Sequence, residues 1–298
     1  MKVFVIGATG YVGSHVSAAL SASGHEVTGL VRDAAKAMLV EKAGATPFVG
    51  SLENLGPVLE QAEAADATVF AAQLMQDEEA SVIRTFLQRY RKTGKTFIMT
   101  SGTGVLGQPT FGEWSEDTFA EDDDFVPSKY LVVRRSTELA VQAAAHDGVR
   151  AMVIRPPAIW GNGVHRFVDH ILKSIDVTGS ACYIGRGLNL YTHVHIDDLA
   201  QLYRLALERG TAGALYHAAA GELNNRSIAE YVAQRKGVGT RSVTVSEAID
   251  IWGKFATLIV LGVCSRSRSP RSRRELGWAP RQTDLAQEIL DGRFSGLA

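Results

Sequence analysis

The chain has 298 residues, of which 46% are hydrophobic and 21% are charged, and its formal net charge is −1. This length allows a sizeable core, and the balanced composition excludes an intrinsically disordered chain and offers no basic excess for nucleic acid or a membrane surface. The two cysteines, Cys182 and Cys264, lie far apart without C-x-x-C spacing, so we expect reduced core thiols rather than a disulfide framework or a zinc site.

The first 20 residues predict a strand, a glycine turn and a helix. Apolar residues at 3–6 form a short run typical of a buried parallel strand, and Gly7, Gly10 and Gly13 follow it. Apolar residues then recur at helical spacing over 12–20. This order places backbone N–H groups and a helix N-terminus where a pyrophosphate can bind, so it predicts a dinucleotide site.

Strands and helices alternate through the rest of the first half. We expect strands at 27–31, 45–50, 67–72, 96–100 and 151–154, and helices at 34–43, 54–64, 77–91 and 128–146. Alternation at this pace predicts a parallel, doubly wound α/β sheet.

In the second half the regular alternation of strands and helices ends, which predicts an appended small domain. We expect helices at 165–175, 197–207, 227–234 and 246–260, and strands at 181–184 and 214–218. The predicted division is a dinucleotide-binding domain over 1–160, to which the chain returns around 191–218, and a smaller substrate domain from 161–190 and 219–298.

Two charged stretches predict solvated loops. The acidic run 121–124 has no interleaved histidine, which argues against a metal site. The arginines of the basic stretch 266–274 could grip a phosphate or RNA, but the stretch has no interleaved aromatic residue, so we expect a mobile loop.

We expect a cytoplasmic protein. The sequence starts directly on the first strand, with no charged leader or apolar signal core. The longest apolar stretch, 251–264, is interrupted by Lys254 and is too short to cross a bilayer, so it predicts a buried helix.

The residues after the second strand bear on the choice of cofactor. Arg32 and Asp33 follow Gly13 by 19 and 20 residues, about where a Rossmann fold meets the adenosine ribose. An arginine suits the 2′-phosphate of NADP, whereas a carboxylate suits the ribose hydroxyls of NAD. Arg32 comes first, so we expect NADP, with NAD as the alternative; both residues could also merely end the strand.

Five motifs in order resemble those of the extended and atypical short-chain dehydrogenases, the NAD-dependent epimerase/dehydratase superfamily. GATGYVG at 7–13 is similar to the family's TGxxGxxG, TSGTGVLG at 100–107 to SSxxxVYG, RPPAIWGNG at 155–163 to RPxxVYGPG, HVHIDDLA at 193–200 to FVHVDDLA, and RRELGWAP at 273–280 to the C-terminal LGW-P signature. The resemblance spans nearly the whole chain. It implies a Rossmann-type sheet with a smaller C-terminal α/β substrate domain.

The same resemblance implies which residues contact the cofactor. They belong to the glycine turn and to the segments that follow the parallel strands. The set is Gly7, Thr9, Gly10, Tyr11, Val12, Gly13, Arg32, Ser51, Leu52, Ala71, Ala72, Gln73, Thr100, Tyr130, Pro156, Pro157, Ala158 and Ile159.

In the family a tyrosine and a lysine four residues later transfer the proton, and a serine or threonine holds the substrate oxygen. Tyr130 matches the tyrosine, and Arg134 stands in the place of the lysine. Positions i and i+4 share a helix face, so the cation would lie beside the phenol and favour its ionised form. Gly102 falls on the hydroxyl position, which leaves its neighbours Ser101 and Thr103 as candidates.

The catalytic assignment has an alternative. Arginine keeps its charge, but its planar fork cannot reproduce the contacts of a lysine to the nicotinamide ribose. Tyr130 could instead be a core or interface residue, with Arg134 paired to Glu138 at i, i+4. Lys129 precedes Tyr130, and we expect its side chain to face elsewhere.

A cluster of His193, His195, Asp197 and Asp198 resembles a metal site at first sight. Catalytic zinc needs a third protein ligand, for which the sequence gives no sign. In the resembling family this segment begins a helix, so we expect the two aspartates to cap or anchor it, and we expect no metal.

The resulting hypothesis is an NADP-dependent reductase or dehydrogenase that moves a hydride to or from a carbonyl or imine carbon of a small molecule. A sugar-nucleotide epimerase or dehydratase and a dinucleotide-binding sensor without chemistry are the alternatives. The resemblance implies a homodimer through 77–91 and 128–146 and a substrate site near aromatic residues that favour an apolar ligand. Those residues are Phe111, Trp114, Trp160, His165, Phe167 and Tyr183.

Overall fold

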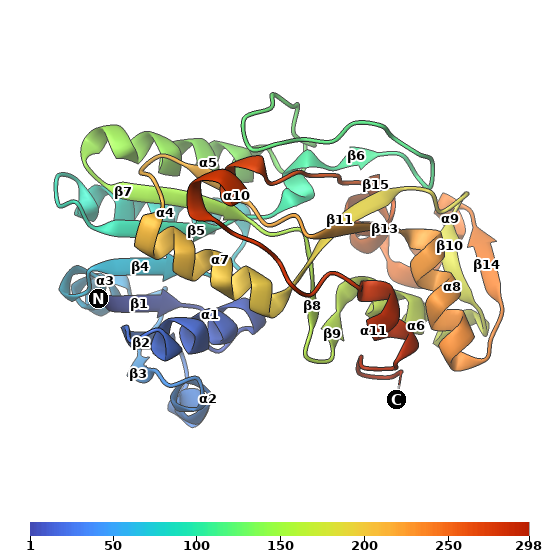
Figure 1. Cartoon of the computed structure of the whole chain (residues 1–298), viewed down its shortest axis with the longest axis horizontal. Helices are drawn as coiled ribbons and strands as arrows, with labels where there is room; N and C mark the ends of the chain where they lie inside the picture. Colours follow the sequence, from blue (N-terminus) through green and yellow to red (C-terminus); the bar gives the residue numbers. More distant parts are fainter. Residues whose placement is uncertain (298) are drawn as a thin grey trace.

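The apolar runs of the first half and one strand from the second half form a seven-stranded sheet in the computed structural model, which describes residues 1–297 (Figure 1). In spatial order its strands are β12 (Leu215–His217), β7 (Arg150–Arg155), β5 (Thr96–Thr100), β4 (Ala67–Phe70), β1 (Lys2–Ile6), β2 (Glu26–Val31) and β3 (Thr46–Val49). Every neighbouring pair is parallel. The predicted doubly wound α/β fold is therefore confirmed, and its strand order reverses between β1 and β4, where such folds bind ligands.

Helices cover both faces of this sheet. On one face lie α1 (Tyr11–Ala22), α2 (Ala37–Lys42) and α7 (Ile196–Arg209), and on the other α3 (Leu55–Ala64), α4 (Gln76–Tyr90) and α5 (Val132–Ala143). Val3 and Val5 of β1 pack on the first face, whereas Phe4 and Ile6 pack on the second. Because both faces are buried, β1 reads as a continuous apolar run rather than an alternating one.

The second half adds a smaller lobe, drawn on the right of Figure 1. It contains a four-stranded sheet in the order β13 (Gly221–Asn224), β11 (Leu190–His195), β8 (Ala158–Gly161) and β9 (Val164–His165). Two further sheets have two strands each: β10 (Ala181–Ile184) with β14 (Thr240–Val243), and β6 (Gln108–Pro109) with β15 (Val263–Cys264). Its helices are α6 (Arg166–Thr178), α8 (Asn225–Lys236), α9 (Val245–Trp252), a π-helix (Ala256–Leu261) and α11 (Leu285–Leu290), and 3-10 turns elsewhere span Ala34–Lys36, Thr103–Leu106 and Ala144–Asp147. Within residues 1–297 every helix is too short or too polar to span a lipid bilayer.

Two expected helices are wrong in their extent. The helix expected at 128–146 begins at Val132, and its last turn is a 3-10 turn. The helix expected at 246–260 ends at Trp252, because Gly253 has a φ of 83°, and the chain continues as a π-helix. A π-helix carries its side chains at a wider period than an α-helix, which an apolar pattern alone does not reveal.

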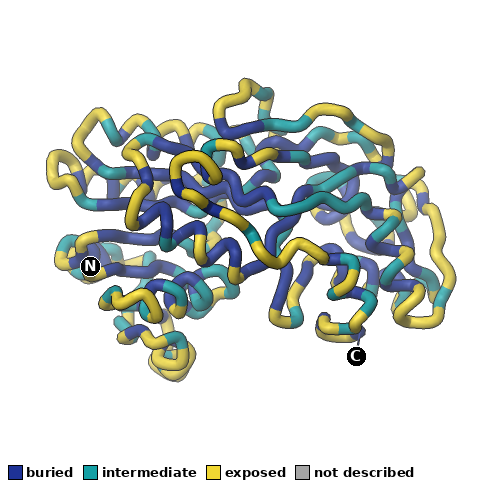
Figure 2. The backbone as a smooth tube through the Cα atoms, viewed as in Figure 1, coloured by how far each residue is buried: buried dark blue, intermediate teal, exposed yellow. Residues whose placement is uncertain are grey.

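The C-terminal segment joins both lobes. After β15 the chain runs back over the large sheet to α10 (Pro270–Leu276) and then returns to α11 (Figure 1). Leu276 and Trp278 belong to the core between the sheet and α7, so this part of 219–298 does not pack with the small lobe as expected. Figure 2 shows the strands of the large sheet as buried and the segment that follows α10 as exposed.

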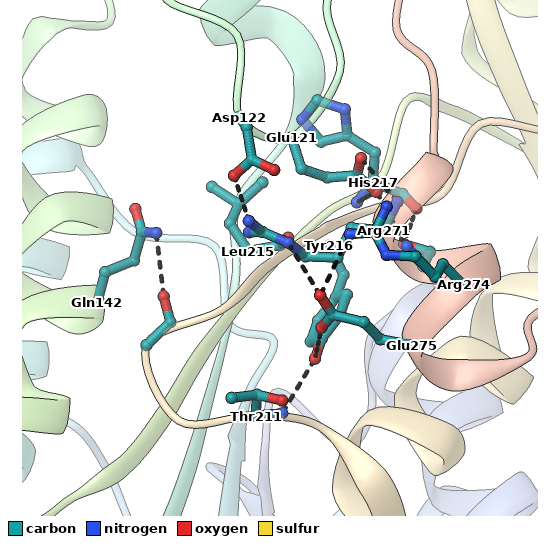
Figure 3. A network of polar contacts seen from close by, with 12 residues as sticks. Glu121, Asp122, Gln142, Thr211, Leu215, Tyr216, His217, Arg271, Arg274 and Glu275 are labelled. Carbon is teal, nitrogen blue, oxygen red and sulfur yellow. Dashed lines mark hydrogen bonds and ion pairs between the residues drawn. The ribbon is translucent and has the colours of Figure 1, made fainter.

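The acidic run and the basic stretch hold each other in place (Figure 3). The expected mobile loop over the basic stretch is therefore wrong, and the expected solvated loop over the acidic run is wrong at Glu121. Glu121 is 8% exposed and accepts hydrogen bonds from the backbone N–H groups of Arg271, at 3.2 Å, and Ser272, at 3.1 Å. The Ser272 hydroxyl also donates to Glu121, at 3.2 Å. Asp122 forms an ion pair with Arg271, so the opposite charges neutralise each other across about 150 residues of sequence.

This clamp predicts a difference between two acidic residues of the same run. Glu121→Ala would leave buried donors of α10 without an acceptor and is expected to lower the free energy of unfolding by about 2 kcal/mol. Asp124→Ala removes an exposed carboxylate and is expected to change it by less than about 0.5 kcal/mol. Urea unfolding followed by circular dichroism measures both, and equal effects would contradict the role of Glu121.

Candidate active site

The glycine turn between β1 and α1 brings backbone segments unusually close together. Gly7 has a φ of 89°, and a Cβ there would lie 2.7 Å from backbone atoms of Ala71 and Ala72. A Cβ on Gly13 would lie 2.1 Å from the carbonyl oxygen of Gly7. Gly10 precedes α1, and no side chain caps this helix within residues 1–297. The N–H groups of the first turn therefore remain open to an anion, and the turn fits a dinucleotide pyrophosphate.

The other residues expected to bind the cofactor follow the carboxyl ends of the parallel strands, at the same edge of the sheet. The Ala71 N–H donates to the Ile6 carbonyl at 2.8 Å, which joins this segment to the glycine turn. Thr100 ends β5, and its hydroxyl accepts from that of Tyr203 at 2.7 Å. The remaining residues are placed as follows: Thr9 in the turn, Val12 at the start of α1, Ser51 and Leu52 after β3, Ala72 and Gln73 after β4, and Pro156, Pro157, Ala158 and Ile159 after β7 and into β8.

The two residues after β2 have different environments. The carboxylate of Asp33 accepts a hydrogen bond from the N–H of Ala35 at 2.9 Å and so caps the following 3-10 turn. Arg32 lies one residue beyond β2, and its side chain is exposed. Asp33 is thus used by the local backbone, whereas Arg32 is available to a ligand.

Two contacts of α1 join the lobes, and neither was predicted from the sequence. The Tyr11 hydroxyl donates to the carbonyl of Gly161 at 2.7 Å, and burial raises the pKa of this phenol. One turn further along α1, a ring nitrogen of His15 lies 2.8 Å from the amide nitrogen of Asn162. Tyr11 thus also fixes the small lobe beside the glycine turn.

Tyr130 lies in a turn, not in a helix as expected. Helix α5 begins at Val132, so Tyr130 and Arg134 do not share a helix face. Gln76, the first residue of α4, holds this turn: its amide nitrogen donates to the Tyr130 carbonyl at 2.7 Å, and its amide oxygen accepts from the Arg134 N–H at 3.1 Å. The Tyr130 side chain is 50% exposed.

Arg134 pairs with neither Tyr130 nor Glu138. Its guanidinium donates to the carboxylate of Glu79 on α4 at 3.1 Å, where the Glu79 side chain is 2% exposed. Burial raises the pKa of Glu79, and the charge of Arg134 opposes this rise. The expected pairing at i, i+4 is therefore wrong, and the charge of Arg134 is used on a buried carboxylate.

The two candidate hydroxyls are also turned away from solvent. The Ser101 hydroxyl donates to Glu138 at 2.5 Å. The same carboxylate accepts from Arg155 at 2.7 Å and from Arg135 at 3.2 Å. Thr103 is 1% exposed. Neither hydroxyl lines the neighbouring cavity, so the structure does not bring Ser101 or Thr103 together with Tyr130 in one open site.

That cavity has a volume of about 460 Å³ and opens beside Tyr130. Its apolar walls include Phe111, Val126, Leu131, Leu258, Ile259 and Val263. Its polar lining consists of Gln108, Ser128, Lys129 and Tyr130. The Lys129 ammonium lies 5.1 Å from the centre of the Tyr130 ring, so the expectation that Lys129 faces elsewhere is wrong.

Most of the aromatic residues expected near the substrate have other roles. Phe111 lines the cavity. Trp160 and Phe167 are buried in the small-lobe core. Burial also lowers the pKa of His165 to about 3, so its ring is neutral. The remaining two stack with arginines: Trp114 with Arg266 and Tyr183 with Arg226.

The histidine and aspartate cluster is scaffolding. His193 accepts a hydrogen bond from the Trp160 indole at 3.1 Å, and His195 caps α7 by accepting from the N–H of Asp197 at 3.2 Å. The carboxylate of Asp198 accepts from the N–H groups of residues 281 and 282 and so anchors the C-terminal segment. In the part of the chain that the structure describes, no group of three potential ligands is placed to hold a metal ion.

Comparison with known proteins identifies a family. The profile of the NAD dependent epimerase/dehydratase family matches residues 3–219. An uncharacterized protein of Schizosaccharomyces pombe is 32% identical over 99% of this chain and 100% of its own. An uncharacterized protein of Saccharomyces cerevisiae is 31% identical over 97% of this chain and 98% of its own. A 4-hydroxy-2-methyl-3-oxo-4-farnesyl-3,4-dihydroquinoline-1-oxide ketoreductase of Stigmatella aurantiaca is 25% identical over 98% of this chain and 95% of its own.

Solved structures share the fold. The dTDP-glucose 4,6-dehydratase DesIV of Streptomyces venezuelae, with NAD and TYD bound, gives a TM-score of 0.76 at 20% identity and covers 98% of this chain and 96% of its own. MoeE5 in complex with UDP-glucuronic acid and NAD gives a TM-score of 0.74 at 17% identity, covering 97% of this chain and 96% of its own. At these identities the likeness shows the fold alone.

The close approach at Gly13 generates a test of the cradle. Gly13→Ala would force the turn open and is expected to weaken binding of NADH and NADPH by at least about tenfold, measured by isothermal titration calorimetry. Gly239→Ala is the matched control, because a Cβ there would meet no atom within 4 Å. A folded Gly13→Ala protein with unchanged affinity would rule out this turn as the binding site.

Proposed function

Because the chain belongs to the NAD dependent epimerase/dehydratase family, we propose that it is an NADP-dependent oxidoreductase that transfers a hydride to or from a carbonyl or imine carbon of a small apolar molecule. One observation carries this proposal: a half-exposed tyrosine, Tyr130, lines an apolar cavity of about 460 Å³ that continues from the loop after β5. The volume is within the range of small-molecule sites, about 300–1,000 Å³.

The residues of the nucleotide edge suit a dinucleotide. The turn from Gly7 to Gly13 would hold the pyrophosphate through backbone N–H groups, and the segments after β3, β4 and β7 would line the remainder. The exposed guanidinium of Arg32 is suited to a 2′-phosphate, since Asp33 is already used as a cap. This difference supports NADP over NAD.

The cavity supports an apolar substrate. Eight apolar side chains, two of them prolines, form its walls, and Gly102 contributes no hydroxyl where the family has one. Sugar chemistry needs many polar contacts, so this lining favours reduction of a simple carbonyl over epimerisation of a sugar nucleotide. The similarity to a ketoreductase whose named substrate carries a farnesyl group is consistent with this choice.

In the reductive direction, the bound dinucleotide supplies the hydride. Tyr130 would donate its phenolic proton to the substrate oxygen as the alcohol forms. Gln76 positions Tyr130 by donating a hydrogen bond from its side-chain amide to the backbone carbonyl of Tyr130. The apolar walls of the cavity exclude water from the reacting carbon.

Tyr130→Phe tests the reaction. The variant is expected to lose turnover by about 10²–10⁴-fold, because the proton donor is gone, while its affinity for NADPH stays unchanged. The assay follows oxidation of NADPH with a panel of apolar ketones and aldehydes. Tight binding of NADPH without turnover by the unaltered protein, on every compound of the panel, would favour the sensor function instead.

Arg32→Ala tests the choice of cofactor. Loss of a charge-assisted contact to the 2′-phosphate is expected to weaken NADPH binding by about ten- to hundredfold and to leave NADH binding unchanged. Lys42→Ala, at the far end of α2, is the control for removal of a nearby positive charge. Equal losses for both cofactors would argue against a 2′-phosphate contact.

A further inference from the structure

We propose that Lys129, rather than Arg134, supplies the cation that assists Tyr130 in proton transfer, a role that rests on the function proposed above. Lys129 would act through Tyr130 and is therefore a positioning residue.

The charge of Arg134 is not available to the phenol. Its guanidinium is held 3.1 Å from the carboxylate of Glu79, whose side chain is 2% exposed. Withdrawing Arg134 toward Tyr130 would leave this buried carboxylate unpaired, which is strongly unfavourable. The pair is close to neutral as a unit, so it contributes little field at the cavity.

The backbone around Tyr130 keeps these two side chains apart. Gln76 binds the carbonyl of Tyr130 with one end of its amide and the N–H of Arg134 with the other. This contact fixes Arg134 in the first turn of α5 and Tyr130 in the preceding turn. The i, i+4 geometry that would bring a cation beside the phenol is thus absent from this part of the described chain.

Lys129, which precedes Tyr130 in the chain, places a positive charge beside the phenol ring that Arg134 does not reach. Its ammonium lies 5.1 Å from the centre of the Tyr130 ring, and it is the one charged residue that lines the cavity within residues 1–297. The charged groups of α4 and α5 on this side pair among themselves, Arg134 with Glu79 and Arg135 with Glu138. The walls at 104–111 and 258–263 contribute no charged lining residue. Lys129 and Tyr130 are both exposed, so the ammonium acts partly through solvent, and its effect on the phenol is expected to weaken as salt is added.

Proton transfer from Tyr130 accompanies the addition of hydride to the substrate carbonyl. The hydride adds to the carbonyl carbon, the electron pair of the C=O π bond moves to oxygen, and that oxygen takes the proton from Tyr130. The O–H bond of the phenol breaks as the new O–H bond forms, which leaves a phenolate. The Lys129 ammonium stabilises this phenolate until a proton from solvent converts it back to the phenol.

Four variants separate Lys129 from Arg134. Lys129→Met is expected to lower kcat by about tenfold or more, with little change in the KM for NADPH, and Lys129→Arg is expected to restore most of the rate because it keeps the charge. Glu79→Met with Arg134→Met removes the buried pair as a unit, so the fold survives, and kcat is expected to stay near that of the unaltered protein. Lys173→Met on α6 controls for loss of one surface charge.

A second readout needs no turnover. The ultraviolet absorbance of the phenolate, taken as the difference between each variant and the same variant with Tyr130→Phe, isolates one of the eight tyrosines. The phenolate is expected at lower pH in the unaltered protein and in Lys129→Arg than in Lys129→Met. A titration unchanged by Lys129→Met, or one shifted by the Glu79→Met and Arg134→Met pair instead, would overturn the proposal. Absence of turnover would count against the proposed function alone.

Discussion

The buried ion pair between Glu138 of α5 and Arg155 of β7 is the interaction on which the site's geometry depends. The two side chains are 0% and 1% exposed, so either charge left alone would be strongly destabilising. Their remaining hydrogen-bonding capacity is used by Ser101, Arg135 and His217. The pair therefore ties the loop after β5, helix α5 and strands β7 and β12 into one unit beside the cavity.

The ring of His217 completes this unit only in its neutral form. One ring nitrogen lies 2.9 Å from the carbonyl of Arg268 and must donate, because a carbonyl only accepts. The other then accepts from Arg155, at 3.2 Å. Burial, with the charge of Arg155, lowers the pKa of His217 to about 3, so this arrangement holds at neutral pH. Through Arg268 the ion pair also reaches the C-terminal segment.

The nucleotide half of the site could be predicted from sequence because backbone geometry specifies it. Gly13 is required by a contact within its own turn and Gly7 by the close approach of the backbone after β4, and the apolar runs of the strands match their burial. The chemical half could not be predicted in the same way. The partner of Arg134 is Glu79, 55 residues away on α4, and no local spacing indicates that pairing. The orientation of Lys129 depends equally on the turn held by Gln76.

The acidic run 121–124 and the basic stretch 266–274 are a second case in which contacts between distant residues could not be predicted from local sequence. Glu121 reads as exposed when considered alone, and its burial follows only from its meeting the backbone of α10 in space. A stretch of one sign predicts solvent exposure unless its counter-charge is known. The aspartates expected to cap or anchor the start of α7 do not cap it: His195 does so, and Asp198 binds the backbone of the C-terminal segment instead.

The path of residues 269–297 bears on the modularity of this protein. The family profile ends at residue 219, yet Leu276 and Trp278 fill the core beneath α7, and Asp198 binds the backbone of residues 281 and 282. The nucleotide-binding lobe is therefore not a self-sufficient segment of the gene. Recombination or truncation after residue 219 would expose an apolar surface on α7 and leave a carboxylate without donors, so both lobes must be inherited together.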